Sequence, residues 1–511
     1  MIKDKMNVHN ILKKQKEYFQ KIYFSQAFIW IIIIIGALIR LRQYLVNRSL
    51  WTDEAALALN ILKLNYKELL GPLFNGQAAP PFFLLFTKLF TKIAGCSEFV
   101  LRFVPLVSGI IALILFYSLA RNFLSKKAVP LAVAMFAFSS SAIYFSTEFK
   151  QYSLDLLFSV IILLFAIKVI RSNYTIKDCF ILGIIGILST WISHSSIFVL
   201  IGIGLAFIFD VIIINRKIDR RIINYHNLKK ITTIGILWAI SFLLHYLLIL
   251  RFIPKEHFYK FWANYFIPFP PIKLEDFRWY IVHAIEIINN PLGFRLFYGV
   301  VLLTIILGIY KFWNRENKIY LYFLCFPIIT VIIASIFNYY PLYGRLMLFT
   351  IPIFYILIAE GAYQFFEFFS SQKKYLAILF IILLLISPVA NGIRYLITPI
   401  FKEEIKPVIE YYIKNKEEKD KIYVYYGAKN AFEYYTYDKN VMFLSSESGN
   451  RENPQNYLVE LDKLKGEGRI WFIFSHVYSD EEKIFSVYLN YIGHRIDLFK
   501  EKGASVYLYD L

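Results

Sequence analysis

The segment from Ser49 to Ile61 reads SLWTDEAALALNI. It places two adjacent carboxylates, Asp53 and Glu54, after a long apolar run and at the start of another largely apolar segment. Acids in the first turn of a helix interact favourably with the helix dipole, by about 0.3–1 kcal/mol each, and Thr52 is a suitable N-cap. Adjacent helix positions point about 100° apart, so the pair also suits one reactive carboxylate braced by its neighbour.

The composition around this segment is that of a membrane protein. Hydrophobic residues make up 58% of the 511 residues, and only 18% are charged, whereas soluble domains are about half apolar. Apolar runs such as Phe28–Ile39 and Tyr152–Ile167, with their flanks, approach the roughly 20 residues that span a bilayer as a helix. The first run lacks a small-residue cleavage site, so we expect it to remain as an anchor.

Hydropathy predicts about eleven transmembrane helices. The predicted ranges are residues 25–45, 103–123, 128–147, 152–170, 176–193, 197–214, 231–253, 294–312, 319–337, 346–366 and 375–393. The lysines and arginines behind the net charge of +19 gather in every second connection. This pattern places the basic N-terminal segment, residues 1–24, and the basic loops in the cytoplasm, and it argues against a nucleic acid partner.

One further apolar run, Pro80–Gly95, would reverse the orientation of all later helices across the membrane if it crossed the bilayer. It carries Lys88 and Lys92 four residues apart, which favours an amphipathic helix on the outer surface with both lysines facing water. A short tilted span is the alternative.

Residues 394–511 change to a soluble α/β pattern. Strands are expected at KIYVYY, VMFLSS, RIWFIF and ASVYLYDL, and helices at residues 430–437, 453–464 and 480–491. The predicted fold is therefore an α-helical polytopic membrane protein with a small C-terminal α/β extracytoplasmic domain. No glycine-rich phosphate loop follows any of these strands, which argues against nucleotide binding.

Polar residues cluster where two predicted spans meet the outer face, in YFSTEFKQYSLD. Snorkelling to the interface explains Lys150 and Tyr152. Glu148 should lie nearer to water. Asp155 lies about one turn inside a predicted span, where a carboxylate costs a few kcal/mol unless it faces a partner or a wet cavity. Asp155 is therefore a candidate site residue.

Two arginines and a histidine complete the outer polar set. Arg345 opens an apolar helix in NYYPLYGRLMLF, and Arg102 directly precedes Phe103. Each arginine suits either bidentate capture of a phosphate in the leaflet or snorkelling to lipid headgroups. His194, in the WISHSS turn, is a lone histidine and more often structural than catalytic.

The sequence shows no metal-ligand spacing. Its three cysteines, Cys96, Cys179 and Cys325, are far apart in the chain, and we interpret them as packing residues. No internal repeat suggests the inverted halves of a transporter.

The order of these motifs resembles the GT-C fold glycosyltransferases that use polyprenyl-phosphate sugars, those of glycosyltransferase family 39, which include protein O-mannosyltransferases and the lipid A aminoarabinose transferase. The similar motifs are LWTDEA, APPFFLLF with GCSEFVLRFVP, YFSTEFKQYSLDLL, the HSS turn and YGRLML. The resemblance covers roughly residues 30–393. It implies a GT-C transmembrane domain at residues 25–393, a catalytic first outer loop at residues 46–102 and a soluble extracytoplasmic domain at residues 394–511.

The resemblance also implies roles for single residues. Asp53 would be the catalytic carboxylate and Glu54 its neighbour in the acidic motif. Phe149 and Lys150 depart from an E-A-R-x-Y motif common in relatives, and Ala79 replaces the histidine or lysine that commonly precedes the double proline. The candidates for donor-phosphate or substrate binding are Arg102, Glu148, Lys150, Tyr152, Asp155, His194, Tyr343 and Arg345.

The implied reaction transfers a sugar, with inversion, from a polyprenyl-phosphate donor to an acceptor hydroxyl on the outer face of the inner (plasma) membrane. The expected partners are this donor, a glycolipid, glycan or protein acceptor, and membrane lipid. Some relatives show a divalent cation near the acidic loop. No metal-ligand cluster is found in this sequence, so no cofactor is assigned and a divalent cation stays open. The alternatives are a transporter or flippase of lipid-linked precursors and an oligosaccharide ligase.

Overall fold

A computed structural model describes residues 26–214, 225–252, 255–370, 373–439, 441–445 and 455–511. These residues form two compact units. The loop–sheet unit comprises Val46–Ala78, Leu84–Leu101 and Ile400–Leu511, and the helical unit contains the other described residues. The predicted basic segment at residues 1–24 lies outside the described residues, as do the end of the predicted strand VMFLSS and the start of the predicted helix at residues 453–464.

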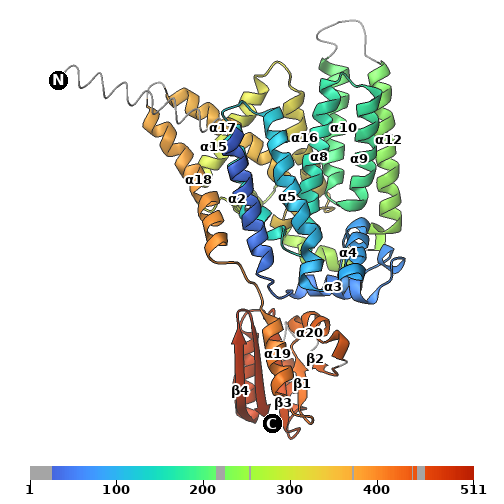
Figure 1. The fold of residues 1–511 in the computed structure, drawn as a ribbon, viewed down its shortest axis with the longest axis vertical. Helices are drawn as coiled ribbons and strands as arrows, with labels where there is room; N and C mark the ends of the chain where they lie inside the picture. The colour runs from blue at the N-terminus through green and yellow to red at the C-terminus, as the bar shows by residue number, and fades with distance from the viewer. Residues whose placement is uncertain (1–25, 215–224, 253–254, 371–372, 440, 446–454) are drawn as a thin grey trace, which may run out of the picture. The chain divides into compact units, whose positions relative to one another are not determined.

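The helical unit is built from helices and short helical turns (Figure 1). They are α2 (Gln26–Leu45), α5 (Glu98–Phe123), α6 (Val129–Ala137), α7 (Ser140–Phe145), α8 (Tyr152–Arg171), α9 (Ile176–Ile192), α10 (Ser196–Phe209), η3 (Asp210–Ile214), α12 (Tyr225–Leu248), η4 (Leu250–Phe252), α13 (Lys255–Trp262), η5 (Ala263–Tyr265), α14 (Leu274–Asn289), α15 (Tyr298–Trp313), α16 (Ile319–Ile336), η6 (Gly344–Thr350), α17 (Ile351–Ser370) and α18 (Lys374–Ile397). The start of α5, up to Leu101, belongs to the loop–sheet unit. Figure 1 shows α8, α9, α10 and α12 as neighbouring helices.

Among the described residues, seven helices are long and apolar enough to cross a membrane. They coincide with seven of the predicted spans, and the predicted spans at residues 197–214 and 294–312 form shorter apolar helices. The prediction of one continuous helix at residues 128–147 is wrong, because the chain breaks between α6 and α7. The hydroxyl of Ser139 accepts the N–H of Ala142 at 3.3 Å and caps α7, which starts a new helix at this point.

Two pairs of basic connections in the helical unit are in contact. Arg315, between α15 and α16, donates to the carbonyl of Phe123 at 2.6 Å and pairs with Glu360 at 2.9 Å. Lys230 of α12 donates to the carbonyl of Tyr174, between α8 and α9, at 2.7 Å. Connections that the charge pattern assigns to one side of the membrane are therefore linked in the structure.

Two glycines let α15 and α17 approach closely. A Cβ added at Gly308 would lie 2.1 Å from the carbonyl oxygen of Leu357, and one at Gly361 would lie 1.8 Å from that of Thr304. Small residues at such contacts allow backbones to pack tightly where lipid offers no hydrophobic driving force.

The loop–sheet unit joins the segment that follows α2 to the C-terminal part of the chain. Its elements are α3 (Thr52–Lys63), η1 (Glu68–Leu70), η2 (Phe74–Gly76), most of α4 (Pro81–Ala94), α19 (Ile405–Asn415), β1 (Lys421–Val424), η7 (Tyr426–Ala428), α20 (Lys429–Tyr435), η8 (Tyr437–Lys439), β2 (Leu444–Ser445), α21 (Gln455–Asp462), β3 (Arg469–Ser475), α22 (Glu481–Ile492), β4 (His494–Glu501) and β5 (Ala504–Asp510). The run at Pro80–Gly95 is thus a helix. Lys92 is exposed as predicted, but Lys88 does not face water alone, because its Nζ donates to the carbonyl of Ile61 at 2.6 Å.

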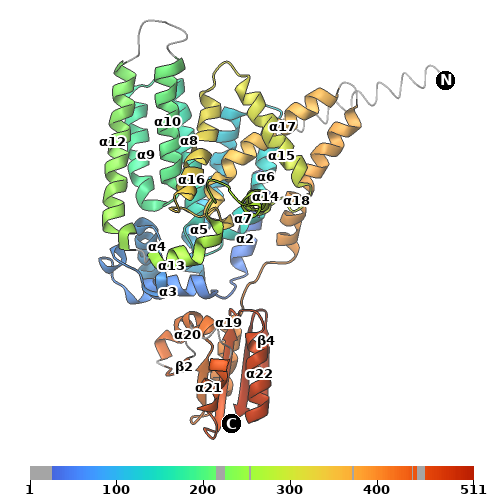
Figure 2. The ribbon, with the colours of Figure 1, turned by 180° about the vertical axis from the view of Figure 1, so that it is seen from behind.

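The strands form one five-stranded sheet in the order β2-β1-β3-β5-β4. β1 is parallel to β2 and β3, and β5 is antiparallel to β3 and β4. Figure 1 shows α19 on one face of the sheet, and Figure 2 shows α21 and α22 on the other. Phe472 of β3 packs in the core on the face of α22, together with Phe485, while Trp471 contacts Tyr412 of α19.

A buried carboxylate ties the start of β1 to β3. Asp420 accepts hydrogen bonds from Nε of Arg469 at 2.8 Å and from the indole N–H of Trp471 at 2.7 Å. Burial alone would raise the pKa of Asp420, but these hydrogen bonds and the positive charge of Arg469 lower it below its ordinary value.

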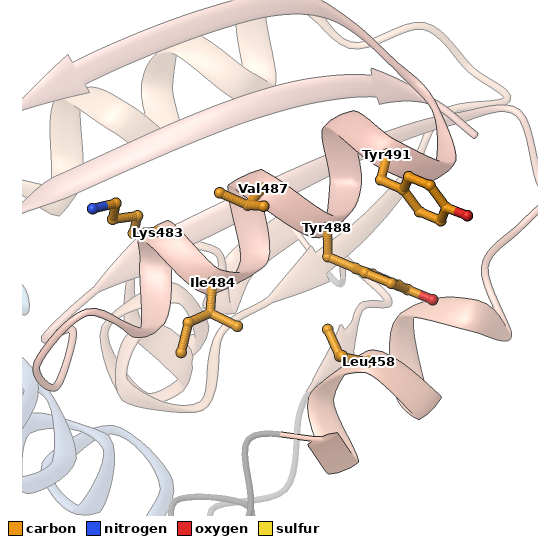
Figure 3. Close-up of a pocket in the computed structure, with 6 residues that line it drawn as sticks. All are labelled: Leu458, Lys483, Ile484, Val487, Tyr488 and Tyr491. Carbon is orange, nitrogen blue, oxygen red and sulfur yellow. The ribbon is translucent and has the colours of Figure 1, made fainter.

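The loop–sheet unit also has a shallow apolar hollow of about 500 Å³ beside α22. Tyr488 of α22 lies next to Leu458 of α21 in this region (Figure 3). The hollow is lined by Leu458, Lys483, Ile484, Val487, Tyr488 and Tyr491. The sequence analysis names none of these residues as a candidate functional residue.

The contact between α15 and α17 predicts that Gly361→Ala destabilises the helical unit. The added methyl group would overlap a backbone carbonyl that cannot move independently, and overpacking of this kind costs about 1–3 kcal/mol. A lower Tm of the purified protein in detergent would show this. Gly235→Ala on α12 is the control, since no described atom lies within 4 Å of the added Cβ. An unchanged Tm for Gly361→Ala would contradict the tight contact.

Candidate functional site

The two acids lie in the first turn of α3 but differ in exposure. Glu54 is completely buried, whereas Asp53 is only half-buried. Thr52 is the first residue of the helix rather than its predicted N-cap, and Trp51 at the N-cap position makes no side-chain capping bond. Asp53 is therefore the more exposed of the two acids, and Glu54 is enclosed by protein.

A buried asparagine shapes the rest of this loop. Asn60 of α3 accepts the N–H of Phe74 at 2.7 Å and donates to the carbonyl of Ala56 at 2.8 Å. These bonds hold η2 against α3. Sequence reasoning missed Asn60, although a polar residue inside an otherwise apolar helical stretch is a usable signal.

In the helical unit, Asp155 lies in the first turn of α8 and is 5% exposed. Ser193 and Ser195 place their hydroxyls beside its carboxylate, and Tyr340 lies close to it. Its Oδ1 atom makes no hydrogen bond to any described residue. The partners that a carboxylate in a span requires thus come from the serines of the WISHSS turn, and one oxygen keeps its capacity to accept a hydrogen bond.

Arg345 lies in η6 between two aromatic rings. Its guanidinium carbon is 6.0 Å from the ring centre of Tyr152 and 5.9 Å from that of Trp262. The ring of Tyr343 is 5.3 Å from Trp262. Tyr340 lies close to both Tyr152 and Asp155. The structure therefore brings Tyr152, Asp155, Tyr343 and Arg345 into one neighbourhood of the helical unit.

Two expectations for the segment that leads into α8 are wrong. The sequence predicts that Glu148 lies near water and that Lys150 and Tyr152 snorkel to the interface, but Glu148 is completely buried, Lys150 is only 6% exposed and Tyr152 only 5%. The turn that carries Glu148 is tight, since the N–H of Lys150 bonds to the carbonyl of Glu148 at 2.7 Å. The hydroxyl of Thr147 also bonds back to the carbonyl of Tyr144 at 3.0 Å.

Arg102 and Ala79 are both enclosed by protein. Arg102, near the start of α5, is 2% exposed and lies close to Tyr44 of α2. Snorkelling to lipid therefore does not describe this arginine. Ala79 is 3% exposed.

His194 pairs with a second histidine that the sequence did not single out. Its ring centre is 5.1 Å from that of His245 on α12, and Trp191 lies 5.3 Å from His245. Both ring nitrogens of the buried His245 make no hydrogen bond to any described residue. Because the two histidines are far apart in the chain, only the packing of α12 against α9 reveals the pair.

Metal coordination has little support in the described ranges. They contain no group of three or more His, Cys, Asp or Glu side chains that could hold a metal ion.

Comparison with protein families gives one match. Residues 78–246 match the family described as dolichyl-phosphate-mannose-protein mannosyltransferase. The matched range includes Arg102, Glu148, Asp155 and His194. A comparison with curated protein sequences found no significant match.

Solved structures agree with the fold over nearly the whole chain. ArnT from Cupriavidus metallidurans in the apo state matches with a TM-score of 0.53 at 10% identity, covering 95% of this chain and 98% of that one. The same protein bound to undecaprenyl phosphate matches with a TM-score of 0.54 at 9% identity and the same coverage. The oligosaccharyltransferase of Archaeoglobus fulgidus, in complex with Zn and sulfate, matches with a TM-score of 0.52 at 13% identity, covering 93% of this chain and 72% of that one.

These findings show the fold of the protein. The chain has the GT-C fold with a small C-terminal sheet domain, and the resemblance to GT-C glycosyltransferases is confirmed. The family match covers residues 78–246 of the 511, and the solved structures, at 9–13% identity, show the fold.

Proposed function

We propose that this protein transfers a sugar from a polyprenyl-phosphate donor to an acceptor hydroxyl, with inversion at the anomeric carbon. The observation that carries the proposal is the acid pair of α3, one half-buried and one enclosed, in a chain with the GT-C fold. The match to ArnT bound to undecaprenyl phosphate supports a lipid-phosphate donor. The acceptor is a hydroxyl of a glycolipid, glycan or protein at the outer face of the inner (plasma) membrane.

The proposed reaction is a single displacement. The carboxylate of Asp53 removes the proton from the acceptor hydroxyl, and the acceptor oxygen forms a bond to the anomeric carbon. The bond between this carbon and the phosphate oxygen breaks, and the polyprenyl phosphate leaves with its electron pair. General-base help of this kind contributes roughly 10²–10⁴-fold, and positioning and electrostatics supply the rest.

Arg345 is the proposed ligand of the donor phosphate. Its guanidinium carbon lies 6.0 Å from the ring centre of Tyr152 and 5.9 Å from that of Trp262, and a planar guanidinium suits bidentate binding of a phosphate whose charge increases as the sugar leaves. Asp155, with one carboxylate oxygen open, is a proposed hydrogen-bond acceptor for a sugar hydroxyl. Glu148, Lys150, Arg102, His194 and Tyr343 are proposed to shape this donor region.

The acid pair generates the first functional prediction. Asp53→Asn keeps the shape of the side chain but removes its basicity, so sugar transfer should fall by roughly 10²–10⁴-fold with little change in folding or donor binding. Glu54→Gln should have a smaller effect and should act partly through stability, because Glu54 is enclosed. The measurement is transfer from a synthetic polyprenyl-phosphate sugar, normalised to folded protein. Near-normal turnover of Asp53→Asn would show that the two acids only stabilise the start of α3.

Arg345 generates the second functional prediction. Arg345→Lys keeps the charge but loses the planar fork, so binding of the donor and of polyprenyl phosphate should weaken about tenfold at an unchanged protein level. Arg278→Lys on α14 is the matched control, because Arg278 is exposed. Wild-type affinity and turnover in Arg345→Lys would show that the arginine contacts lipid headgroups and does not bind the donor phosphate.

The proposed orientation is tested by two single cysteines in a background without Cys96, Cys179 and Cys325. Met442→Cys lies in the C-terminal domain and is 93% exposed, and Glu316→Cys lies between α15 and α16. An impermeant thiol reagent added to intact cells should label position 442 and not position 316. Labelling of position 316 alone would show that the orientation is inverted.

A further inference from the structure

The helix that carries the acid pair begins without a cap of its own. The first N–H groups of any helix lack partners within the helix and need them from side chains, water or ligands. Trp51 occupies the N-cap position of α3 and its indole cannot accept a hydrogen bond from these groups, so no side-chain cap is present. The N–H of Thr52, the first residue of α3, has its partner in the C-terminal half of the loop–sheet unit.

Glu404 holds the strand-like segment that leads into α3. Its carboxylate accepts the backbone N–H of Ser49, at 3.3 Å from each oxygen, and the hydroxyl of Ser49 at 3.1 Å. The hydroxyl of Ser49 in turn accepts the N–H of Lys406 at 3.2 Å. The two segments are thus bonded in both directions, and Ser49 is 3% exposed.

Glu403 reaches the helix itself. Its Oε2 atom accepts the backbone N–H of Thr52, the first residue of α3, at 3.3 Å. Its Oε1 atom contacts Nδ1 of His476 at 2.7 Å, directly after β3. A carboxylate at this point both bonds an orphan N–H group and favours the positive end of the helix dipole.

A second connection runs through Tyr435 of α20. The Tyr435 hydroxyl accepts the N–H of Leu50 at 2.8 Å and donates to Glu98 at 3.1 Å. Glu98 also pairs with Lys406 at 2.9 Å. Three backbone donors before and at the helix start, the N–H groups of Ser49, Leu50 and Thr52, are therefore bonded to side chains of the C-terminal domain.

The two glutamates are fixed by the sheet rather than by a free linker. The N–H of Glu404 donates to the carbonyl of Lys502 in the turn between β4 and β5 at 2.8 Å. Gly503, in the same turn, has a φ of +71°, and a Cβ there would lie 2.5 Å from the carbonyl oxygen of Lys402. The ammonium of Lys402 lies 3.5 Å from the ring centre of Trp51. The position of Glu403 and Glu404 is thus set by the folded domain.

We propose that the C-terminal domain positions the catalytic helix, with Glu403 and Glu404 acting as an external cap on the start of α3. They are positioning residues, since they bond to backbone groups next to Asp53 and Glu54 and not to the proposed substrates. The effect of this cap on catalysis rests on the proposed function. The cap itself is supported by the hydrogen bonds within the loop–sheet unit.

The test uses the full-length protein and two readouts. In Glu403→Ala/Glu404→Ala, amide hydrogen exchange over residues 49–56 should rise about tenfold, the change expected when a helix cap is lost. The kcat for sugar transfer should fall by a similar factor, while KM for the donor should change less than twofold, because the donor contacts are untouched. Glu403→Gln/Glu404→Gln keeps acceptor oxygens and should recover most of both losses.

The control is Glu467→Ala, which removes an exposed glutamate of the same domain that pairs with Lys421. It should leave both readouts at wild-type values. Unchanged exchange at residues 49–56 in the double alanine variant would overturn the cap. Faster exchange with unchanged kcat would overturn the positioning role. If the wild-type protein transfers no sugar, the proposed function fails, and the exchange readout still decides whether the C-terminal domain caps α3.

Discussion

The free-energy cost of burying a charge near lipid limits where this protein can place its carboxylates. A carboxylate that leaves water near a bilayer must find hydrogen-bond donors or a wet cavity, or it destabilises the fold by a few kcal/mol. Asp155 meets this requirement with the hydroxyls of Ser193 and Ser195, and Glu360 with Arg315 and the N–H of Ser125. Glu54 and Glu148 are completely enclosed. These four acids are therefore surrounded by other segments of the protein, whereas Asp53, the proposed base, is half-buried.

The C-terminal domain has a structural reason to belong to such a protein. A short helix with an apolar face, a half-buried acid and no cap of its own is marginal in isolation. Side chains of residues 403–404 and of Tyr435, in the C-terminal domain, accept the N–H groups of Ser49, Leu50 and Thr52 at its start. Because the same fold carries different reactions in different proteins, function depends on such local arrangements and not on the fold alone.

Much of the fold could be predicted from hydropathy and charge, because transmembrane helices and strands produce local periodic patterns in the sequence. The break between α6 and α7 was missed, since a single serine cap inside an apolar run leaves hydropathy unchanged. Strand β4 was missed because HRIDLFKE is a charged, mostly exposed edge strand. The partners of the site residues could not be predicted. Ser193 beside Asp155, His245 beside His194 and Glu403 at the start of α3 are brought together only by tertiary packing.

A glycosyltransferase and a flippase of lipid-linked sugars are separated most directly by following the donor itself. The purified protein is placed in liposomes with a synthetic polyprenyl-phosphate sugar and an envelope extract as the source of acceptor, and both lipid products are quantified. The account predicts that free polyprenyl phosphate and glycosylated acceptor appear in equal amounts. Intact donor that only moves between the leaflets, with no polyprenyl phosphate released, would contradict it.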